Sequence, residues 1–436
     1  MYRAIINQLV KWKASPSRKP LILNGARQVG KTYILQEFGA KYYHSTAYLN
    51  LDHNSEAEAI FRQDFDIQRI LRMLSALLHV HIEPGNTLII FDEIQENPLA
   101  LNSLKYFCEQ APEYHVAVAG SLLGISLHSG VSFPVGKVDM VKMYPMTFVE
   151  FLTAIGQESL ADAVLNSDWS LINAFSVRFT DCIRQYYFVG GMPAVIQEYI
   201  TSGNLMAVRE RQKQILFDYR RDFSKHAPAQ QVPRINMVWD SIPAQLAKDN
   251  QKFIYGALKK GGRATEFELA IQWLIDAGLV YRIYRATSPF KPLKFYEDLS
   301  AFKLFMLDVG LMGAMADVDS KDILVADDML REYKGAFTEL YALTQMMPFD
   351  LPTYYYSAND SRIEIDFLVQ FSGRIIPIEV KAEENVKSKS LKTYVDKHPQ
   401  LHALRISMLP YRQEAWMENI PLYAVGAYFR HETMLF

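Results

Sequence analysis

Eight residues near the start of the chain, GARQVGKT at 25–32, have the types and spacing that bind phosphate. The glycines allow backbone N–H groups to turn inward around phosphate oxygens, and a helix that begins directly after the loop adds a favourable potential for an anion. In this pattern Lys31 reaches the β- and γ-phosphates, and the hydroxyl of Thr32 holds Mg²⁺. We therefore expect ATP and Mg²⁺ to bind here. The expected contacts are Gly25, Ala26, Arg27, Gln28, Val29, Gly30, Lys31, Thr32 and Tyr33.

Two acidic residues, Asp92 and Glu93, directly follow the apolar stretch 88–91. In nucleotide hydrolases an aspartate in this place holds the metal, and the glutamate polarises the attacking water. We expect Lys31, Asp92 and Glu93 to be catalytic, although adjacent acids at a strand end also occur as solvated caps. Ser121 follows the next apolar stretch and is expected either to sense the γ-phosphate or to cap a helix. Spacing assigns no arginine finger, and the candidates are Arg184, Arg220 and Arg221.

A second set of acidic residues lies near the C-terminus, where Asp366, Glu379 and Lys381 follow the pattern D-x12-E-x-K. In a hairpin the two stretches lie side by side, and Glu379 and Lys381 point to the same face. Asp366 and Glu379 could hold a second divalent metal, Mg²⁺ or Mn²⁺, that activates water against a phosphodiester. The flanks are apolar, so these charges cost free energy unless they are paired or used. A purely structural ion pair is the alternative.

The phosphate-binding loop requires a strand before it and a helix after it. The pattern predicts a helix over 2–12, a strand over 21–23 and a second helix from Lys31 to Phe38. Uninterrupted apolar runs separated by helical stretches indicate a parallel sheet covered on both faces. Its further strands are expected at 48–51, 88–91 and 116–119.

The middle of the chain has a different pattern. Residues 151–204 are mostly helical, and 233–285 give helical stretches, a glycine turn, an amphipathic helix over 266–277 and a strand over 279–284. This is the order of a winged helix. Basic residues near the start of the amphipathic helix could meet a DNA backbone, but the helix itself is acidic, which favours a packing module. The basic residues are Lys259, Lys260 and Arg263, and the expected core positions are Leu269, Ile271, Trp273 and Leu274.

Alternating apolar residues at 363–367 and 376–380 predict an antiparallel pair of strands in a second α/β unit. We expect three domains: a P-loop nucleotide-binding domain with a helical extension over 1–205, a winged-helix-like domain over 206–300 and a C-terminal α/β domain over 301–436. The fold class is thus α/β multidomain.

The ordered motifs GARQVGKT, LIIFDEIQ, AVAGSLLG, MYPMTFVEFL and YFVGGMPAVI resemble those of prokaryotic AAA-type ATPases fused to a C-terminal domain of uncharacterised function. The later stretches KLFMLDVGLMG, GAFTELYAL and EIDFLVQ…IIPIEVKA are also similar to that family. The resemblance implies an AAA-like domain, a winged-helix middle and a restriction-endonuclease-like C-terminal fold. In the latter fold an acid from the preceding helix often joins the site, which implies a nuclease site of Glu339, Asp366, Glu379 and Lys381.

The bulk properties restrict the partners. The formal net charge is −2, so DNA binding requires local basic patches. The two cysteines, Cys108 and Cys182, have no metal-site spacing, which suits a reducing cytoplasm. No uncharged stretch approaches the ~20 residues of a membrane span, and we expect no membrane partner.

These patterns support two main hypotheses. The first is a Mg²⁺-dependent ATPase coupled to a nuclease-like C-terminal domain that binds DNA. The second is a switch-type signalling or assembly ATPase, in which a catalytically inactive C-terminal domain binds a protein partner or a second copy of the chain. A DNA-binding regulator that does not need ATP is a third.

Overall fold

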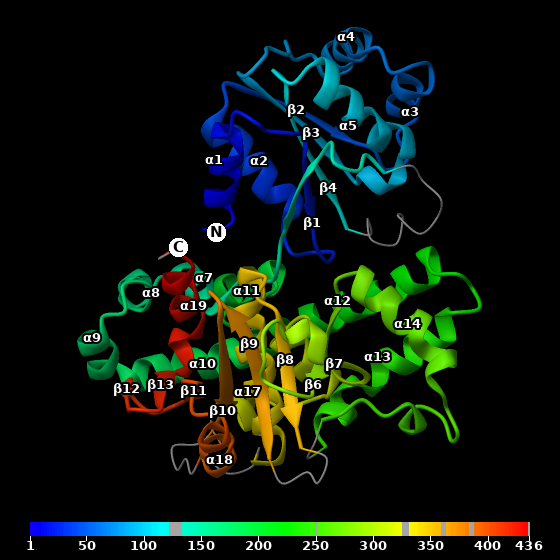
Figure 1. The fold of residues 1–436 in the computed structure, drawn as a ribbon. Helices are drawn as coiled ribbons and strands as arrows, with labels where there is room; N and C mark the ends of the chain where they lie inside the picture. The colour runs from blue at the N-terminus through cyan, green and yellow to red at the C-terminus, as the bar shows by residue number, and fades with distance from the viewer. Residues whose placement is uncertain (122–132, 249–250, 325–330, 359–362, 383–387, 435–436) are drawn as a thin grey trace. The chain divides into compact units, whose positions relative to one another are not determined.

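The computed structural model describes every residue except 122–132, 249–250, 325–330, 359–362, 383–387 and 435–436. The chain divides into two units, which we treat separately (Figure 1). The N-terminal unit contains Arg3–Tyr144 with Asp276–Gly278, and the C-terminal unit contains Met1–Tyr2, Pro145–Ile275 and Leu279–Phe436.

A five-stranded parallel sheet forms the centre of the N-terminal unit, in the order β2-β3-β4-β1-β5. The parallel sheet and the four expected strands are confirmed. The fifth strand was not expected because its residues alternate between half-buried and exposed, without the apolar run that marks the others. The strands are β1 (Leu21–Asn24), β2 (Ser45–Asn50), β3 (Thr87–Asp92), β4 (His115–Gly120) and β5 (Asp139–Lys142).

Helices cover both faces of this sheet, so the inner strands β3 and β4 are buried along their whole length and β1 is buried except at its last residue. On one face Trp12 packs against Phe38 with ring centroids 6.5 Å apart. The other face carries a cluster that includes Ile60, Leu74 and Phe107. The first face is covered by α1 (Ile6–Ala14) and α2 (Lys31–Tyr42), and the second by α3 (Ser55–Arg62), α4 (Ile67–Leu78) and α5 (Pro98–Gln110).

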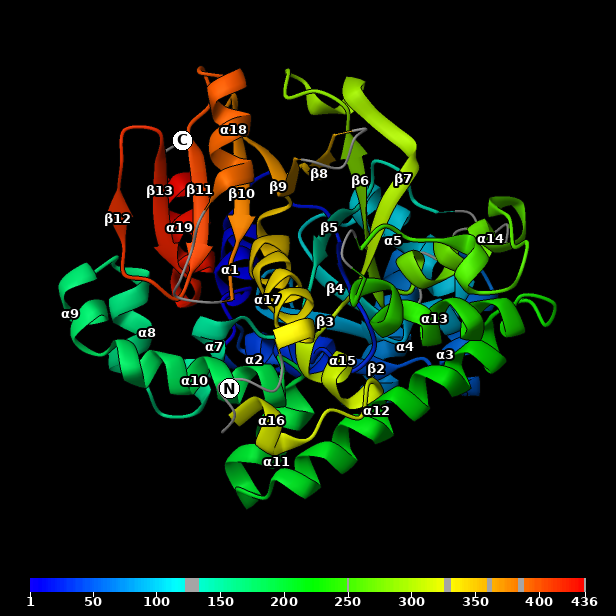
Figure 2. The same cartoon turned by 90° about the horizontal axis from the view of Figure 1, so that it is seen from below.

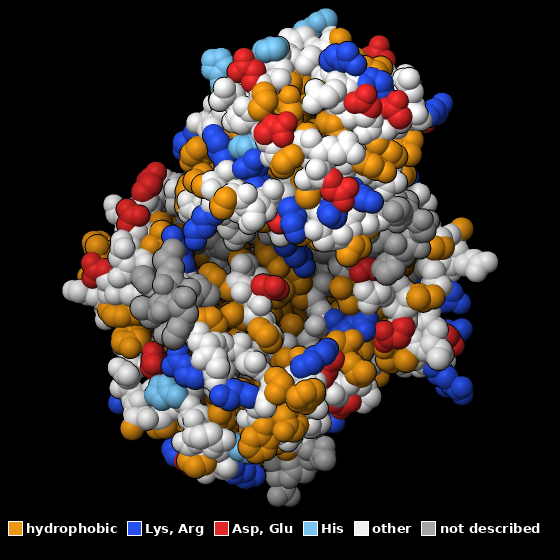
Figure 3. Space-filling model, turned by 45° about the horizontal axis from the view of Figure 1, so that its top comes forward, with side chains coloured by type: hydrophobic (Ala, Val, Ile, Leu, Met, Phe, Trp, Pro, Cys, Tyr) orange, Lys and Arg blue, Asp and Glu red, His pale blue; other side chains and the backbone are white. Residues whose placement is uncertain are grey.

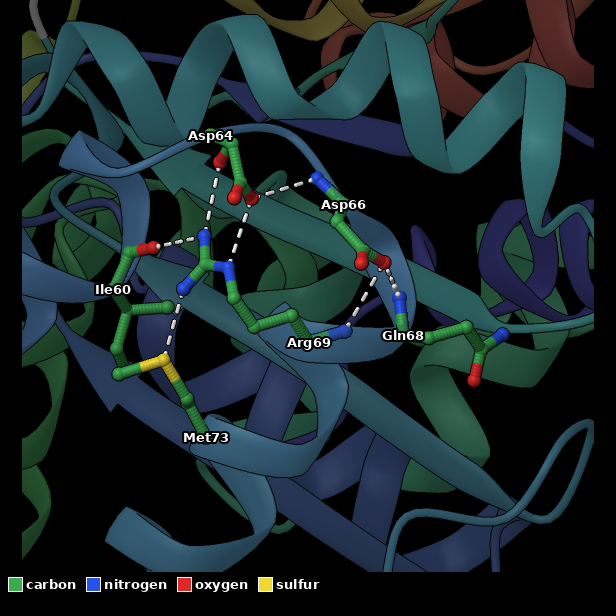
Figure 4. Close-up of polar contacts among 6 residues, drawn as sticks. All are labelled: Ile60, Asp64, Asp66, Gln68, Arg69 and Met73. Atoms are coloured by element: carbon green, nitrogen blue, oxygen red, sulfur yellow. Dashed lines mark hydrogen bonds and ion pairs between the residues drawn. The ribbon is translucent and has the colours of Figure 1, made fainter.

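Polar contacts of Arg69 fix the connection between α3 and α4 (Figure 4). Its guanidinium donates to Oδ1 of Asp64 at 2.8 Å and to the carbonyl of Ile60 at 2.9 Å. Asp66 caps α4 by accepting hydrogen bonds from the backbone N–H groups of Gln68 and Arg69. These bonds satisfy donors that a helix start would otherwise leave unpaired.

The C-terminal unit begins with a helical stretch, as the pattern of 151–204 predicted. A helix–helix–helix–hairpin order then follows over the residues expected to form a winged helix. Within its third helix Ile271, Trp273 and Leu274 are buried, but Leu269 is 67% exposed, so its expected core position was wrong. The helices are α7 (Phe148–Ala154), α8 (Glu158–Leu165), α9 (Trp169–Ala174), α10 (Ser176–Val189), α11 (Pro193–Ser202), α12 (Leu205–His226), α13 (Val232–Leu246) and α14 (Ala264–Asp276).

An eight-stranded mixed sheet spans the rest of this unit in the order β12-β13-β11-β10-β9-β8-β6-β7 (Figure 2). The expected antiparallel pair is confirmed as β9 and β10, with Ile378 opposite Phe367. The strands are β6 (Val280–Ala286), β7 (Glu297–Met306), β8 (Thr353–Ser357), β9 (Glu364–Phe371), β10 (Arg374–Val380), β11 (Ala403–Ser407), β12 (Arg412–Gln413) and β13 (Met417–Pro421).

The domain boundary that we expected between residues 300 and 301 lies inside β7, so this sheet contains residues from both sides of it. The β6–β7 hairpin pairs with β8, so the segment read as a winged helix shares a sheet with the C-terminal strands. The remaining helices of the unit are α15 (Val309–Met315), α16 (Ser320–Leu324), α17 (Arg331–Met346), α18 (Lys389–Lys397) and α19 (Val425–Met434).

Two motifs that are distant in sequence meet at Asp308, the residue before α15. Its carboxylate accepts hydrogen bonds from the N–H of Gly191 at 2.6 Å and of Leu311 at 2.9 Å. Gly190 has φ 77°, and a Cβ there would lie 2.3 Å from Oδ1 of Asp308. Burial raises the pKa of Asp308 to about 6, against the lowering effect of the backbone N–H donors. The close approach requires glycine in the YFVGGMP motif.

The face drawn in Figure 3 carries Lys and Arg side chains interspersed with Asp and Glu side chains, as a net charge near zero implies. Among the described residues no helix is both long and apolar enough to cross a membrane.

Candidate functional site

The glycine loop leads from β1 into α2 and contains two glycines with positive φ. Gly30, at φ 95°, is the residue before α2, and Gly25 has φ 154°. A Cβ at Gly25 would lie 2.3 Å from the carbonyl oxygen of Met143, so no larger residue fits without movement of the backbone. The expected strand–loop–helix arrangement is present.

Lys31 lies at the start of α2 and is buried. Its ammonium donates to the carbonyl oxygens of Gly25 at 3.0 Å and Ala26 at 2.8 Å, inside the curve of the loop. Burial lowers the pKa of Lys31 to about 8, although the nearby Glu93 and Asp92 raise it. The loop therefore holds a cation whose charge is costly until an anion binds beside it.

Thr32 and Asp92 are joined directly, with Thr32 Oγ1 donating to Asp92 Oδ2 at 2.8 Å. Tyr48, on β2, donates its phenol to the same oxygen at 2.8 Å. The N–H of Glu93 donates to the other oxygen, Oδ1, at 3.0 Å. Three donors thus fix the buried carboxylate of Asp92 at the end of β3. Sequence reasoning missed Tyr48, whose only signal was a polar tip on a strand next to β3.

Glu93 follows β3 with φ 52°, a left-handed conformation that is uncommon outside glycine. Its Oε2 accepts a hydrogen bond from Nε2 of Gln95 and lies 3.5 Å from Oγ of Ser121. Ser121 is buried at the end of β4, the strand between β1 and β3. The structure thus brings Glu93 and Ser121 together, and Gln95 is a partner that the sequence did not predict.

The other loop residues have different environments. Ala26 and Val29 are buried, Arg27 is half-buried, and Gln28 is exposed with φ 65°. Tyr33 is 54% exposed on the first turn of α2.

Arg3, which the sequence did not mark as part of the site, forms a hydrogen bond to the backbone of the glycine loop. Arg3 donates to the carbonyl oxygens of Val29 at 2.8 Å and Tyr144 at 2.6 Å. Because it is buried, it ties the loop to the end of the sheet.

The candidate arginine fingers all belong to the C-terminal unit. Arg220 forms an ion pair with Asp240, and Arg184 lies 4.0 Å from Asp181. Arg221 lies over the ring of Phe217, 6.0 Å from its centroid. Their roles stay unassigned.

The second expected site lies where β9 and β10 pair. Oδ2 of Asp366, on β9, accepts a hydrogen bond from the N–H of Val380 at 2.7 Å. Glu379 is buried on β10, and its Oε1 lies 3.2 Å from Nζ of Lys381. The three residues of the D-x12-E-x-K pattern are thus gathered on neighbouring strands.

Glu339 has other partners. From α17 it accepts a hydrogen bond from Gln251 at 2.7 Å on Oε1, while its Oε2 lies 3.4 Å from the ammonium of Lys303. Burial raises the pKa of Glu339 to about 7, against the lowering effect of Lys303. Lys303 is also 3.1 Å from Oε1 of Glu364. Sequence reasoning missed Lys303, although a lysine inside the apolar run AFKLFM was a signal.

Among the described residues no group of three or more His, Cys, Asp or Glu side chains has the arrangement needed to hold a metal ion.

Three families match consecutive parts of the chain. Residues 17–152 match the family described as AAA domain, and this range contains the loop, Asp92, Glu93 and Ser121. Residues 17–152 are an AAA-type ATPase domain. Residues 180–322 and 334–424 match two domains of unknown function, DUF8612 and DUF4143. No curated protein matches the chain.

Several solved structures are similar over much of the chain. A Walker-type ATPase of Pyrococcus abyssi is 14% identical with a TM-score of 0.47, covering 72% of this chain and 95% of that one. Orc1 of Aeropyrum pernix, solved in complex with DNA, is 14% identical with a TM-score of 0.28, covering 72% and 92%. Cdc6p of Pyrobaculum aerophilum is 13% identical with a TM-score of 0.25, covering 73% and 93%. These scores are too low to establish a shared fold, so the AAA assignment depends on the family match and the loop geometry.

The AAA domain offers suitable oxygen atoms for Mg²⁺. Oγ1 of Thr32 and Oδ2 of Asp92 lie 2.8 Å apart beside the loop, and hydroxyl and carboxylate oxygens are ligands that Mg²⁺ prefers. Because both atoms are already fixed by the fold, the donor set fits the metal that an ATPase domain uses.

Proposed function

We propose that the AAA domain binds and hydrolyses ATP with Mg²⁺, and that the C-terminal unit is a non-catalytic module whose interactions follow the nucleotide state. The observation that carries the first part is the direct Thr32–Asp92 hydrogen bond with Glu93 next in the chain. Thr32 and Asp92 would hold Mg²⁺, which would supply charge neutralisation of the phosphates.

Three other residues of the domain have separate roles in the hydrolysis of ATP. Lys31 exchanges the carbonyls of Gly25 and Ala26 for phosphate oxygens. Glu93 orients a water molecule toward the γ-phosphorus and takes its proton as the P–O bond to ADP breaks, leaving ADP and phosphate. Ser121, whose Oγ lies 3.5 Å from the Glu93 carboxylate, would sense whether the γ-phosphate is present.

ATP turnover by purified full-length protein tests this proposal. Glu93→Gln is expected to lower the turnover number about 10²- to 10⁴-fold, the usual contribution of a general base, while ATP still binds. Lys31→Ala is expected to abolish binding. Unchanged turnover in both variants would refute the assignment. Glu113→Gln, at an exposed acid in the same domain, is the control for charge removal.

The non-catalytic assignment of the C-terminal unit is supported by the partners of Glu339. A carboxylate that is engaged by Lys303 and Gln251 is not free to complete a metal site with Asp366 and Glu379. A nucleotide-dependent change of oligomeric state, followed by light scattering with and without ATP, is the expected behaviour of such a module. An oligomeric state that ATP leaves unchanged, together with ATP-dependent DNA binding, would count against it.

Metal-dependent cleavage of DNA is the second candidate function. It is favoured by the adjacency of Asp366, Glu379 and Lys381 and by Oε2 of Glu379, which is buried without a hydrogen-bond partner among the described residues. Incubation of the protein with plasmid DNA, ATP and Mg²⁺ or Mn²⁺ tests it. Cleavage by the wild-type protein that Asp366→Ala abolishes would establish this candidate. If neither the wild-type protein nor the variant cleaves the plasmid, the candidate is excluded.

A further inference from the structure

A buried ammonium group lies inside the carboxylate cluster of the C-terminal unit, which consists of Glu339, Glu364, Asp366 and Glu379. Lys303, on β7, is 1% exposed, and its Nζ lies 3.1 Å from Glu364 Oε1 and 3.4 Å from Glu339 Oε2. The ring of Tyr355, on β8, is also near, with its centroid 5.2 Å from Nζ. A buried ammonium is tolerated only where its partners replace the lost hydration. Two carboxylates and an aromatic face do so here.

The charge balance keeps this lysine protonated. Burial by itself lowers the pKa of Lys303, but Glu339, Glu364 and Asp366 together raise it above its ordinary value. The ammonium form is therefore favoured at neutral pH, and it contacts acids on α17 and β9. Its position makes it the partner common to these two elements.

Glu339 and Asp366, two of the acids that a metal ion would need as ligands, already have hydrogen-bond or ion-pair partners. Both oxygens of Glu339 are engaged, Oε1 by Gln251 and Oε2 by Lys303. One oxygen of Asp366 accepts from the backbone of Val380. A divalent ion bound to Glu339 would also face the fixed positive charge of Lys303 on the same carboxylate, and like charges at such separations repel strongly where water is excluded.

We propose that Lys303 is the resident cation of this cluster, so that its ammonium takes the place of a divalent metal and the C-terminal unit binds neither Mg²⁺ nor Mn²⁺ there. This inference builds on the non-catalytic function proposed for the unit. It assigns Glu339 and Glu364 a structural use, which is to join α17 to the sheet through Lys303. It also implies that removal of the lysine would create a metal site.

Titration with Mn²⁺ of nucleotide-free full-length protein, followed by calorimetry, tests the inference. All proteins carry Asp92→Asn, which removes the metal ligand of the AAA domain. With Lys303 present we expect no Mn²⁺ site that depends on Asp366. Lys303→Met is expected to gain one Mn²⁺ site, with an affinity at least tenfold higher than any weak Mn²⁺ binding by the protein that retains Lys303. Adding Asp366→Asn to this variant should remove the new site.

Lys303→Met takes the ammonium partner from the buried Glu339 and the half-buried Glu364, and could fail to fold. The second variant is therefore Lys303→Gln with Glu364→Gln, which removes one charge of each sign and retains Glu339, Asp366 and Glu379. It is expected to gain the same Asp366-dependent site. Mn²⁺ binding that Asp366→Asn abolishes while Lys303 is intact overturns the inference. A folded variant that gains no site overturns it too.

The two proposals fail in different experiments. If the Mn²⁺ titration contradicts the inference, ATP turnover and its dependence on Glu93 are still expected. Loss of the ATPase assignment would appear as turnover that Lys31→Ala and Glu93→Gln do not change, whatever the C-terminal cluster binds.

Discussion

The phenol of Tyr48 and the hydroxyl of Thr32 donate hydrogen bonds to the same oxygen of Asp92, each across 2.8 Å. Tyr48 lies on β2, the neighbour of β3, so the sheet itself delivers the donor. The acidic neighbours of Tyr48, together with burial, raise its pKa, which keeps the phenol protonated and able to donate.

Tyr48→Phe removes this donor and retains the ring. Hydrogen bonds to charged groups contribute ~1.5–3 kcal/mol, and we expect the free energy of unfolding of the N-terminal unit to fall by about that amount. A double-mutant cycle with Asp92→Ala measures the coupling by urea denaturation. Additive effects of the two substitutions would show that Tyr48 does not position Asp92.

ATP binding should weaken as the pH rises above about 8. Burial lowers the pKa of Lys31 to about 8 from 10.5, so the free protein loses the ammonium over a pH range in which an ordinary lysine keeps it. A bound phosphate favours the charged form, and binding above pH 8 must therefore take up a proton. Between pH 7 and pH 9 we expect roughly a tenfold loss of affinity from this group.

Calorimetry in buffers of different ionisation enthalpy measures the proton uptake directly. ATP itself is fully ionised above pH 8, so the change in affinity between pH 8 and pH 9 comes from the protein. An affinity that does not change between pH 7 and pH 9 would show that Lys31 carries its charge at pH 9 without nucleotide.

Gly190→Ala should destabilise the C-terminal unit far more than Gly156→Ala. The two glycines have φ values of 77° and 75°, and Gly190 also has ψ −170°, a combination that is open almost only to glycine. A Cβ at Gly190 would lie 2.3 Å from Asp308, whereas at Gly156 nothing lies within 4 Å. We expect about 1 kcal/mol for Gly156→Ala and ~3 kcal/mol or more for Gly190→Ala, measured by urea denaturation. Equal losses would contradict the close approach.

Asp308 should make the stability of the unit depend on pH between about 4 and 6. Its pKa is raised to about 6 in the folded protein from 3.8, so over this range the native state binds a proton that the unfolded chain has released. The contribution of Asp308 to stability is therefore greatest below pH 4 and is lost as the pH rises through 6. The limiting slope for one proton is about 1.4 kcal/mol per pH unit.

Asp308→Asn has no such titration. Its stability should be lower overall, because an amide NH₂ would face a backbone N–H, but the difference from wild type should shrink as the pH rises from 4 to 6. Urea denaturation at several pH values gives this difference. A constant difference would indicate that Asp308 is ionised throughout.

Much of the N-terminal unit could be predicted because its signals are local. The apolar runs before the loop and before Asp92 became β1 and β3, and the loop leads into α2. The sequence did not predict β5, because a short strand at the edge of a sheet needs no apolar run. The boundary expected at residue 300 lies inside β7 because hydrogen bonding between distant strands leaves no mark in a local pattern.

The sequence by itself determined the phosphate loop, because glycine spacing, a lysine and a threonine act within one turn of chain. It also determined that Asp92 and Glu93 follow a buried strand, and that Asp366, Glu379 and Lys381 share a pair of strands. The tertiary structure alone decided which groups these acids meet. Tyr48 reaches Asp92 from β2, and Lys303 reaches Glu339 and Glu364 from β7. A buried charge takes the partner that lies closest in space, and the fold, not the spacing along the chain, sets that distance.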